Sequence, residues 1–136
     1  MRGRHQGQSE QSRDDRHDFW GVVLDAPDAY ELAQFYATLL GWTHQASAGA
    51  TFISIAPPDG VAYLATQTAA GYTPPVWPHE LGAQQMMMHL DFEVSDLEVA
   101  TEHAVSLGAS VMQFQPQANV RVLADPAGHP FCLYLG

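Results

Sequence analysis

A pattern of apolar and turn-forming residues occurs twice in this chain at an interval of 68 residues, and this repeat limits the possible folds more than any other feature. Residues 21–28 (GVVLDAPD) and 89–96 (HLDFEVSD) are both short apolar runs that end in Asp. The same interval relates 55–65 (IAPPDGVAYLA) to 123–133 (LADPAGHPFCL), where a turn with Pro and Gly separates two strand-like runs. Such a repeat indicates two copies of one supersecondary unit.

A helical pattern follows the first run in each copy. Asp28 and Glu31 form a capping-box-like start, apolar residues recur at helical spacing, and Gly41 ends the segment. In the second copy, Asp96 caps the start and Gly108 ends the segment. We therefore predict an α+β fold of two pseudo-repeated modules, each a strand, a helix and a small antiparallel meander. Pairing their sheets gives one curved mixed sheet with the helices outside and a concave inner face.

The repeat also predicts how the chain is divided. The expected parts are a mobile tail (1–18) and one domain (19–136), made of modules 19–67 and 86–136 that a loop at 68–85 joins. The tail has no aliphatic residue after its first residue, which is typical of a segment that cannot offset its ordering entropy by burial. The loop is rich in Pro and Gly and carries Trp77. It is either a packed lid or a cover for the seam between the modules.

Charge is distributed unevenly along the chain. The formal net charge is −10, and all of it arises after residue 18, where Arg121 is the one basic residue against eleven acidic ones. Such a domain repels phosphate backbones and anionic lipids, so we expect neither nucleic acid nor membrane as a partner. A neutral or cationic small molecule fits better. Because no apolar run could span a membrane or act as a signal peptide, we predict a cytoplasmic protein.

The first strand of the second module carries the candidate site. Period-two alternation places His89, Asp91 and Glu93 on one face, and the apolar residues between them on the face that packs on the helix. Three ionisable groups are costly in a dry core, so their face must be wet, paired or built for a ligand. His89 is either a ligand-contacting residue or a structural histidine held by Asp91 or a backbone carbonyl. Arg121 is a possible partner for one of the carboxylates.

Several stretches of the sequence resemble a known superfamily. They are FYATLLGW (35–42), PPVWP (74–78) followed by QQMMMH (84–89), HLDFEVSDL (89–97) and DPAGHPFCL (125–133). In order and spacing they resemble the glyoxalase/bleomycin-resistance/extradiol-dioxygenase superfamily, also called vicinal oxygen chelate, and within it the glyoxalase-like domain branch. The resemblance covers nearly all of the domain at 19–136. It implies paired βαβββ modules, a cup-shaped site and a homodimer.

The same resemblance bears on metal binding. Metal-dependent members of the superfamily hold a divalent ion at four positions, one on the first strand and one on the last strand of each module. The resemblance places these positions at Gly21, Leu64, His89 and Cys132. Glycine and leucine have no ligating side chain, and one His with one Cys gives too few donors for an octahedral site. Asp91 can assist His89 only with a third partner, so we expect no metal and no other cofactor.

Two classes of function fit these observations. The first is a metal-independent small-molecule-binding protein, similar to the drug-sequestering resistance proteins of the superfamily, which holds a neutral or cationic, aromatic metabolite or drug in its cup. The residues expected to bind this ligand are His89, Asp91, Glu93, Trp77, Trp42, Tyr63 and Cys132. The second is a metal-independent isomerase, epimerase or lyase acting on a secondary metabolite, with His89 or Asp91 as general base. A structural or regulatory dimer without a ligand is the third and least specific reading.

Other reactive side chains are assigned structural or surface roles. Cys132 is expected to be a small buried apolar residue and not a nucleophile, because the domain offers no electropositive surroundings. His44 and His129 occupy loop or turn positions, where we expect exposure, and His103 is expected on the helix surface.

Overall fold

A computed structural model describes Arg13 and residues 16–136 of the chain. The described residues fall into two compact units, one ending at Ala69 and the other formed by Ala70–Gly136. The predicted mobile tail falls largely on residues 1–12 and 14–15, which lie outside the described residues. No helix in the described part of the chain is long and apolar enough to cross a lipid bilayer.

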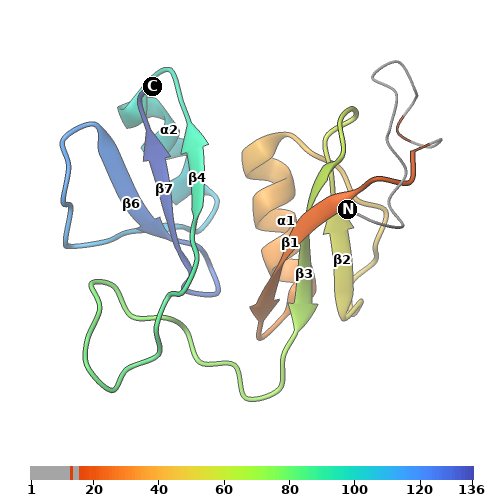
Figure 1. Ribbon diagram of the computed structural model, residues 1–136, viewed down its shortest axis with the longest axis horizontal. Helices are drawn as coiled ribbons and strands as arrows, with labels where there is room; N and C mark the ends of the chain where they lie inside the picture. The colour runs from red at the N-terminus through yellow and green to blue at the C-terminus, as the bar shows by residue number, and fades with distance from the viewer. Residues whose placement is uncertain (1–12, 14–15) are drawn as a thin grey trace. The chain divides into compact units, whose positions relative to one another are not determined.

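The first unit is a three-stranded mixed sheet with one helix across one face (Figure 1). Its elements, in chain order, are β1 (Trp20–Ala26), α1 (Ala29–Leu40), β2 (Phe52–Ile55) and β3 (Ala62–Thr68). The central strand β3 runs parallel to β1 and antiparallel to β2. A single bridge joins Thr43 to Ala56, just after the helix.

The second unit is a four-stranded mixed sheet, also with one helix against it (Figure 1). Its elements are β4 (Leu90–Glu93), α2 (Leu97–Ser106), β5 (Ser110–Val111), β6 (Val120–Ala124) and β7 (Pro130–Tyr134). The strand order is β4-β7-β6-β5, with β7 parallel to β4 and antiparallel to β6. The order β1-β3-β2 of the first unit matches β4-β7-β6, and the Thr43–Ala56 bridge stands in place of β5. The α+β class and the predicted repeat are therefore confirmed, whereas the pairing of the two sheets into one curved sheet stays a prediction.

Helix α1 forms where the sequence places an N-cap before an apolar stripe. The Asp28 carboxylate accepts hydrogen bonds from the backbone N–H groups of Tyr30 (2.8 Å) and Glu31 (3.2 Å), which have no partner within the helix. Gly41 ends the helix in the left-handed conformation, with φ of 65°. Residues of the stripe that are almost fully buried against the sheet include Leu32, Phe35 and Tyr36.

Helix α2 repeats this construction with a different C-terminal end. The Asp96 carboxylate accepts hydrogen bonds of 3.0 Å from the backbone N–H groups of both Glu98 and Val99. Leu107 caps the helix in the right-handed region, and Gly108 follows with φ of 112°. Both predicted N-caps are thus confirmed, and the glycine after each helix takes a positive φ as expected.

The strand registers show that equivalent positions on the last strands of the two units, β3 and β7, are 67 and not 68 residues apart. Paired residues on neighbouring strands place their side chains on the same face. On the face away from the helix, one row of the first sheet is Val23, Ala65 and Ser54, and the equivalent row of the second is Asp91, Cys132 and Val122. The position equivalent to Cys132 is therefore Ala65 and not Leu64, which corrects the prediction. The reason is that the β2–β3 connection (56–61) is one residue longer than the β6–β7 connection (125–129).

Candidate functional site

A pocket of about 420 Å³ opens on the helix-free face of the second sheet. The residues that line it are Trp77, His89, Asp91, Pro116, Gln117, Asn119, Val120, Val122, Cys132 and Tyr134. Four of the seven predicted ligand-binding residues are among them: Trp77, His89, Asp91 and Cys132. The sequence alternation along the first strand of this unit therefore assigns the correct face to its polar side chains.

The sheet itself brings several of these lining residues together. Asp91 of β4 pairs with Cys132 of β7, which pairs with Val122 of β6, so their side chains form one row. His89 lies two residues before Asp91, immediately ahead of β4, and lines the same pocket. The backbone pairing of the strands therefore determines which of these side chains lie next to one another.

His89 and Asp91 form a pair within the lining of the pocket. The His89 Nε2 and Asp91 Oδ1 atoms are 3.2 Å apart, and the two side chains are 39% and 55% exposed. The contact leaves the other ring nitrogen, Nδ1, for a different partner. Asp91 thus holds the His89 ring, as one of the two predicted roles requires, and contact of His89 with a ligand stays a prediction.

Cys132 is half-buried beside this pair. Burial is the largest cause that raises the pKa of its thiol, to about 11, and the negative charge of Asp91 and a hydrogen bond to its carboxylate act in the same direction. The thiol therefore keeps its proton at neutral pH and is a poor nucleophile, since nucleophilic attack needs the thiolate.

The divalent metal that the resemblance implies can be tested against these positions. In the first unit, Gly21 has no side chain, Leu64 is buried with an apolar side chain, and Ala65 offers no donor either. The four-position metal set of the superfamily therefore does not fit this chain. In the second unit, however, the donor atoms of His89, Asp91 and Cys132 all lie within 4.8 Å of one another. The sequence interpretation counted Cys132 with His89 and Asp91 with His89, but it did not bring all three residues together.

Trp77 forms part of the pocket wall from the loop that precedes β4. Its indole N–H donates a hydrogen bond of 3.2 Å to the carbonyl of Phe114, and the two rings lie tilted with centroids 6.2 Å apart. A backbone hydrogen bond of 3.0 Å from Val76 N–H to the Gln84 carbonyl closes the loop on itself. Trp77 is therefore held within the second unit, as an aromatic surface in the lining of the same pocket.

The other three predicted ligand-binding residues lie outside this pocket. Glu93 occupies the next row on the same face, paired with Tyr134, and its carboxylate lies against Gly136. Trp42 and Tyr63 belong to the first unit. Their contribution to a shared cup stays a prediction.

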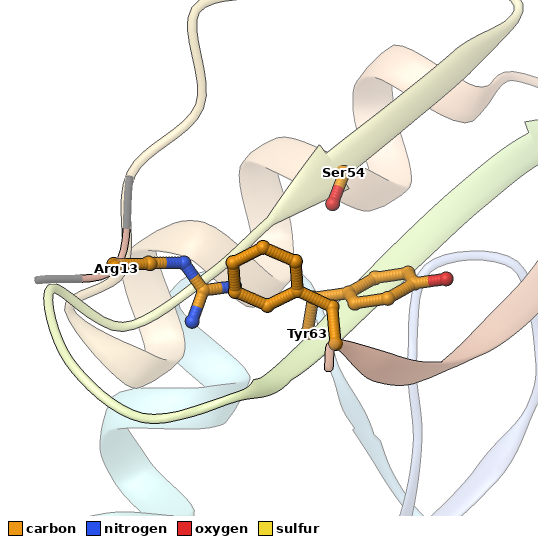
Figure 2. A pocket seen from close by; sticks show the side chains of 4 residues that line it. Arg13, Ser54 and Tyr63 are labelled. Carbon is orange, nitrogen blue, oxygen red and sulfur yellow. The ribbon is translucent and has the colours of Figure 1, made fainter. Parts of the chain in front are cut away.

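Tyr63 lines a separate hollow of about 430 Å³ in the first unit, together with Arg13, Phe19 and Ser54. Figure 2 shows the labelled side chains of Arg13, Ser54 and Tyr63 around it. The Arg13 guanidinium donates hydrogen bonds to the carbonyls of Gly60 (2.9 Å) and Ala62 (3.2 Å) and lies 4.7 Å from the Phe19 ring centroid. Its cation is thus engaged with the backbone and an aromatic ring, which makes this hollow the weaker candidate site.

Arg121 does not face the acidic pocket, which corrects one expectation. It pairs with Leu133, a residue on the helix-covered side of the sheet, and its neighbours Val120 and Val122 line the pocket instead. Alternation along β6 is the reason. Apart from His89, none of the described residues that line the pocket is basic, so Arg121 does not offset the charge of Asp91 there.

His129 is also placed differently from the prediction. Its side chain is only 16% exposed, and its Nδ1 lies 2.8 Å from an oxygen of Asp125, which is fully buried. Its Nε2 lies 3.0 Å from the hydroxyl of Tyr72. Asp125 also accepts hydrogen bonds from the backbone N–H groups of Ala127 (2.9 Å) and His129 (3.0 Å). The signal for this cluster is an Asp-Pro turn followed by His four residues after the Asp, which favours a side-chain-closed turn.

Comparisons with known proteins agree with this architecture. The family model described as a glyoxalase-like domain matches residues 21–134. A solved structure of a possible glyoxalase from Bacillus cereus is 16% identical, with 85% of this chain and 96% of that chain covered and a TM-score of 0.60. The fosfomycin resistance protein FosX from Mesorhizobium loti is 12% identical, with 87% and 91% covered and a TM-score of 0.61.

A glyoxalase/bleomycin resistance protein/dioxygenase family enzyme from Burkholderia phytofirmans is 14% identical, with 83% of this chain and 94% of that chain covered and a TM-score of 0.59. At these identities the likeness concerns the fold. No curated protein matches the sequence of this chain.

Proposed function

The chain belongs to the glyoxalase-like domain family, and from this premise we propose that it binds a small, neutral or cationic molecule with a flat aromatic part in the pocket of its second unit. The observation that carries the proposal is the make-up of that pocket, where the Asp91 carboxylate and the Trp77 ring line one hollow without a Lys or Arg among its described lining residues. The protein's own groups supply all of these contacts, so the binding is metal-independent.

The size of the pocket suits this class of ligand. A volume of about 420 Å³ lies within the range of roughly 300–1,000 Å³ that is usual for small-molecule sites. Apolar wall is provided by Trp77, Val120, Val122 and Tyr134. Small-molecule sites usually combine a few polar side chains, which orient the ligand, with apolar walls, which bury it.

The electrostatics of the pocket favour a cation over an anion. Asp91 lines it and Glu93 lies one row away on the same face. The Cys132 thiol, whose pKa burial and Asp91 raise to about 11, stays neutral at physiological pH, so the negative charge on this face comes from the carboxylates alone. A cationic group beside Asp91 thus gains a charge-assisted hydrogen bond, while a flat ring can rest on Trp77.

The named relatives support a small-molecule role in general terms. Two of them are a fosfomycin resistance protein and a glyoxalase/bleomycin resistance protein/dioxygenase family enzyme. These activities belong to those proteins, and we carry over only the class of ligand, a small organic molecule. The homodimer, the cytoplasmic location and the contributions of Trp42 and Tyr63 stay predictions.

A matched series of probes tests the proposal. We would titrate the protein with N-methylquinolinium, neutral quinoline and anionic quinoline-2-carboxylate, and follow tryptophan fluorescence in a Trp20→Phe/Trp42→Phe background, where Trp77 is the sole tryptophan. The cation should bind best, with quenching of Trp77 and weaker binding as salt rises. Trp77→Ala, followed by calorimetry, should weaken binding of the cation and of the neutral probe.

Two variants that remove the same charge separate the pocket from the rest of the surface. Asp91→Asn should weaken binding of the cation by about 1–3 kcal/mol, the usual scale for losing a charge-assisted hydrogen bond. Glu98→Gln on α2 should leave it unchanged. The proposal is wrong if the anion binds best, or if Asp91→Asn and Trp77→Ala bind all three probes like the wild type.

The His89–Asp91 pair favours a second candidate, a metal-independent isomerase, epimerase or lyase. The contact of 3.2 Å from His89 Nε2 to Asp91 orients the ring and leaves Nδ1 as the proton acceptor for a general base. Chemistry distinguishes the two functions, because a binding protein returns its ligand unchanged. Once native mass spectrometry identifies a bound metabolite, incubation with excess protein should alter it only under the enzymatic hypothesis, and His89→Ala should abolish the change.

A further inference from the structure

We propose that His89, Asp91 and Cys132 form a Zn²⁺ site on the sheet of the second unit, which lies in the same pocket as the small-molecule proposal above but does not rest on it. Each side chain offers one donor atom, and the three donor atoms all lie within 4.8 Å of one another. Donors around tetrahedral Zn²⁺ are roughly 3.3–3.8 Å apart, given Zn–N and Zn–S lengths of about 2.0 and 2.3 Å. Small side-chain rotations therefore suffice to bring them to a common ion.

The surroundings allow those rotations. His89 and Asp91 are 39% and 55% exposed, so neither ring nor carboxylate is locked in place by packing. Cys132 lies on the inner strand β7 between β4 and β6, and supplies a fixed point. One anchored donor and two adjustable ones on the same face can close around an ion without any backbone movement.

The donor set selects the kind of metal. One imidazole nitrogen, one carboxylate oxygen and one sulfur match the ligands that Zn²⁺ takes, whereas Mg²⁺ and Ca²⁺ need oxygen ligands in larger number. Three protein ligands leave the fourth tetrahedral position to water or to a molecule in the pocket, which the same residues line. The first unit offers no donor at Gly21 or Ala65, so the site is built by one sheet alone.

The binding step balances simply. Zn²⁺ forms a bond to the Cys132 sulfur, the thiol proton leaves to the buffer, and the His89 nitrogen and Asp91 oxygen donate lone pairs without any change of oxidation state. Because Asp91 also serves the proposed small-molecule function, Zn²⁺ should compete with a cationic ligand. The zinc measurement uses the metal alone, so its failure leaves the small-molecule proposal standing, and the reverse also holds.

Cobalt substitution provides a direct test on the full chain under reducing conditions. A thiolate bound to Co²⁺ gives an intense near-ultraviolet charge-transfer band, and Cys132 is the sole cysteine of the chain. Binding of Co²⁺ to any of the other histidines produces no such band. We expect the band to saturate at one Co²⁺ per chain, to disappear on addition of Zn²⁺, and to be absent in Cys132→Ser.

Variants and competing metals complete the test. Asp91→Asn and His89→Gln should each weaken Zn²⁺ binding at least about tenfold, since even residues that only support a metal ligand cost that much. Glu98→Gln and His103→Gln, which remove like groups on α2, should bind normally. With the wild-type protein, Cd²⁺ should displace Co²⁺ and excess Mg²⁺ should not. Absence of the band, displacement by Mg²⁺, or wild-type affinity in folded Asp91→Asn and His89→Gln would each overturn the proposal.

Discussion

The two units share one backbone plan but carry different chemistry at equivalent positions. On the helix-free face, Val23, Ala65 and Ser54 form a row in the first sheet where Asp91, Cys132 and Val122 form one in the second. Gly21 precedes the first row as His89 precedes the second. The comparison shows that strand order, caps and register define a scaffold, whereas the side chains of one row decide whether that scaffold can hold a ligand.

The β2–β3 and β6–β7 connections differ most in the buried hydrogen bonds that stabilise them. Asp125 in the second unit is fully buried and accepts hydrogen bonds from His129 Nδ1 and from the backbone of Ala127 and His129. Asp125→Ala should lower the free energy of unfolding by about 3–5 kcal/mol, because it leaves buried donors without a partner. Chemical denaturation measures this. Asp59→Ala, in the exposed connection of the first unit, should cost under about 0.5 kcal/mol; equal losses would contradict the contrast.

Gly21 offers the next largest effect. A Cβ atom at this position would lie 2.5 Å from the Tyr63 ring and 2.5 Å from the Tyr63 carbonyl oxygen, so the backbone must shift to admit it. Gly21→Ala should therefore destabilise the protein by about 1–3 kcal/mol, seen as a lower midpoint in thermal unfolding. Val23→Ala, at the next position on the same face, is the control and should cost under about 1 kcal/mol. A harmless Gly21→Ala would mean that the first unit can accept a side chain where the second carries His89.

The helix N-caps are a feature that the two units share, so equivalent substitutions there should have equal effects on stability. Asp28→Ala and Asp96→Ala each remove a carboxylate that accepts two backbone hydrogen bonds. Each should cost about 1 kcal/mol of unfolding free energy, and the Asn variants should retain most of the stability. Markedly unequal losses would show that the two helices do not contribute alike.

Cys132 gives the smallest expected effect. Burial and Asp91 raise the pKa of its thiol to about 11, so the thiolate fraction at pH 8 is low and increases with pH up to that value. Asp91→Asn removes one raising influence and should lower the pKa. A pKa lower by one unit increases thiolate tenfold but reduces its nucleophilicity, so alkylation by iodoacetamide should quicken about threefold. Glu98→Gln should react at the wild-type rate; an unchanged rate in Asp91→Asn would contradict the assignment of that charge.

Local patterns predicted the scaffold well, because caps and alternation depend on residues close in sequence. Asp28 and Asp96 cap the helices as expected, and His89 and Asp91 line one pocket.

The equivalence of Leu64 with Cys132 was wrong, because the strand register depends on the length of the turn before the last strand, which sequence similarity alone does not determine. The burial of His129 was missed although its partner Asp125 lies only four residues away, while its second partner, Tyr72, is distant in sequence. The meeting of Cys132 with Asp91 required the pairing of strands that are far apart along the chain.

The contacts of Tyr72 and Trp77 have a consequence for the thermodynamics of binding. Tyr72 meets His129 on the β6–β7 connection, and Trp77 donates to the Phe114 carbonyl, so only residues 73–76 lie between two attachment points. So short a tethered segment has few conformations left to lose. The indole is therefore preorganised during folding, and a ligand that stacks on it does not have to order the loop as it binds.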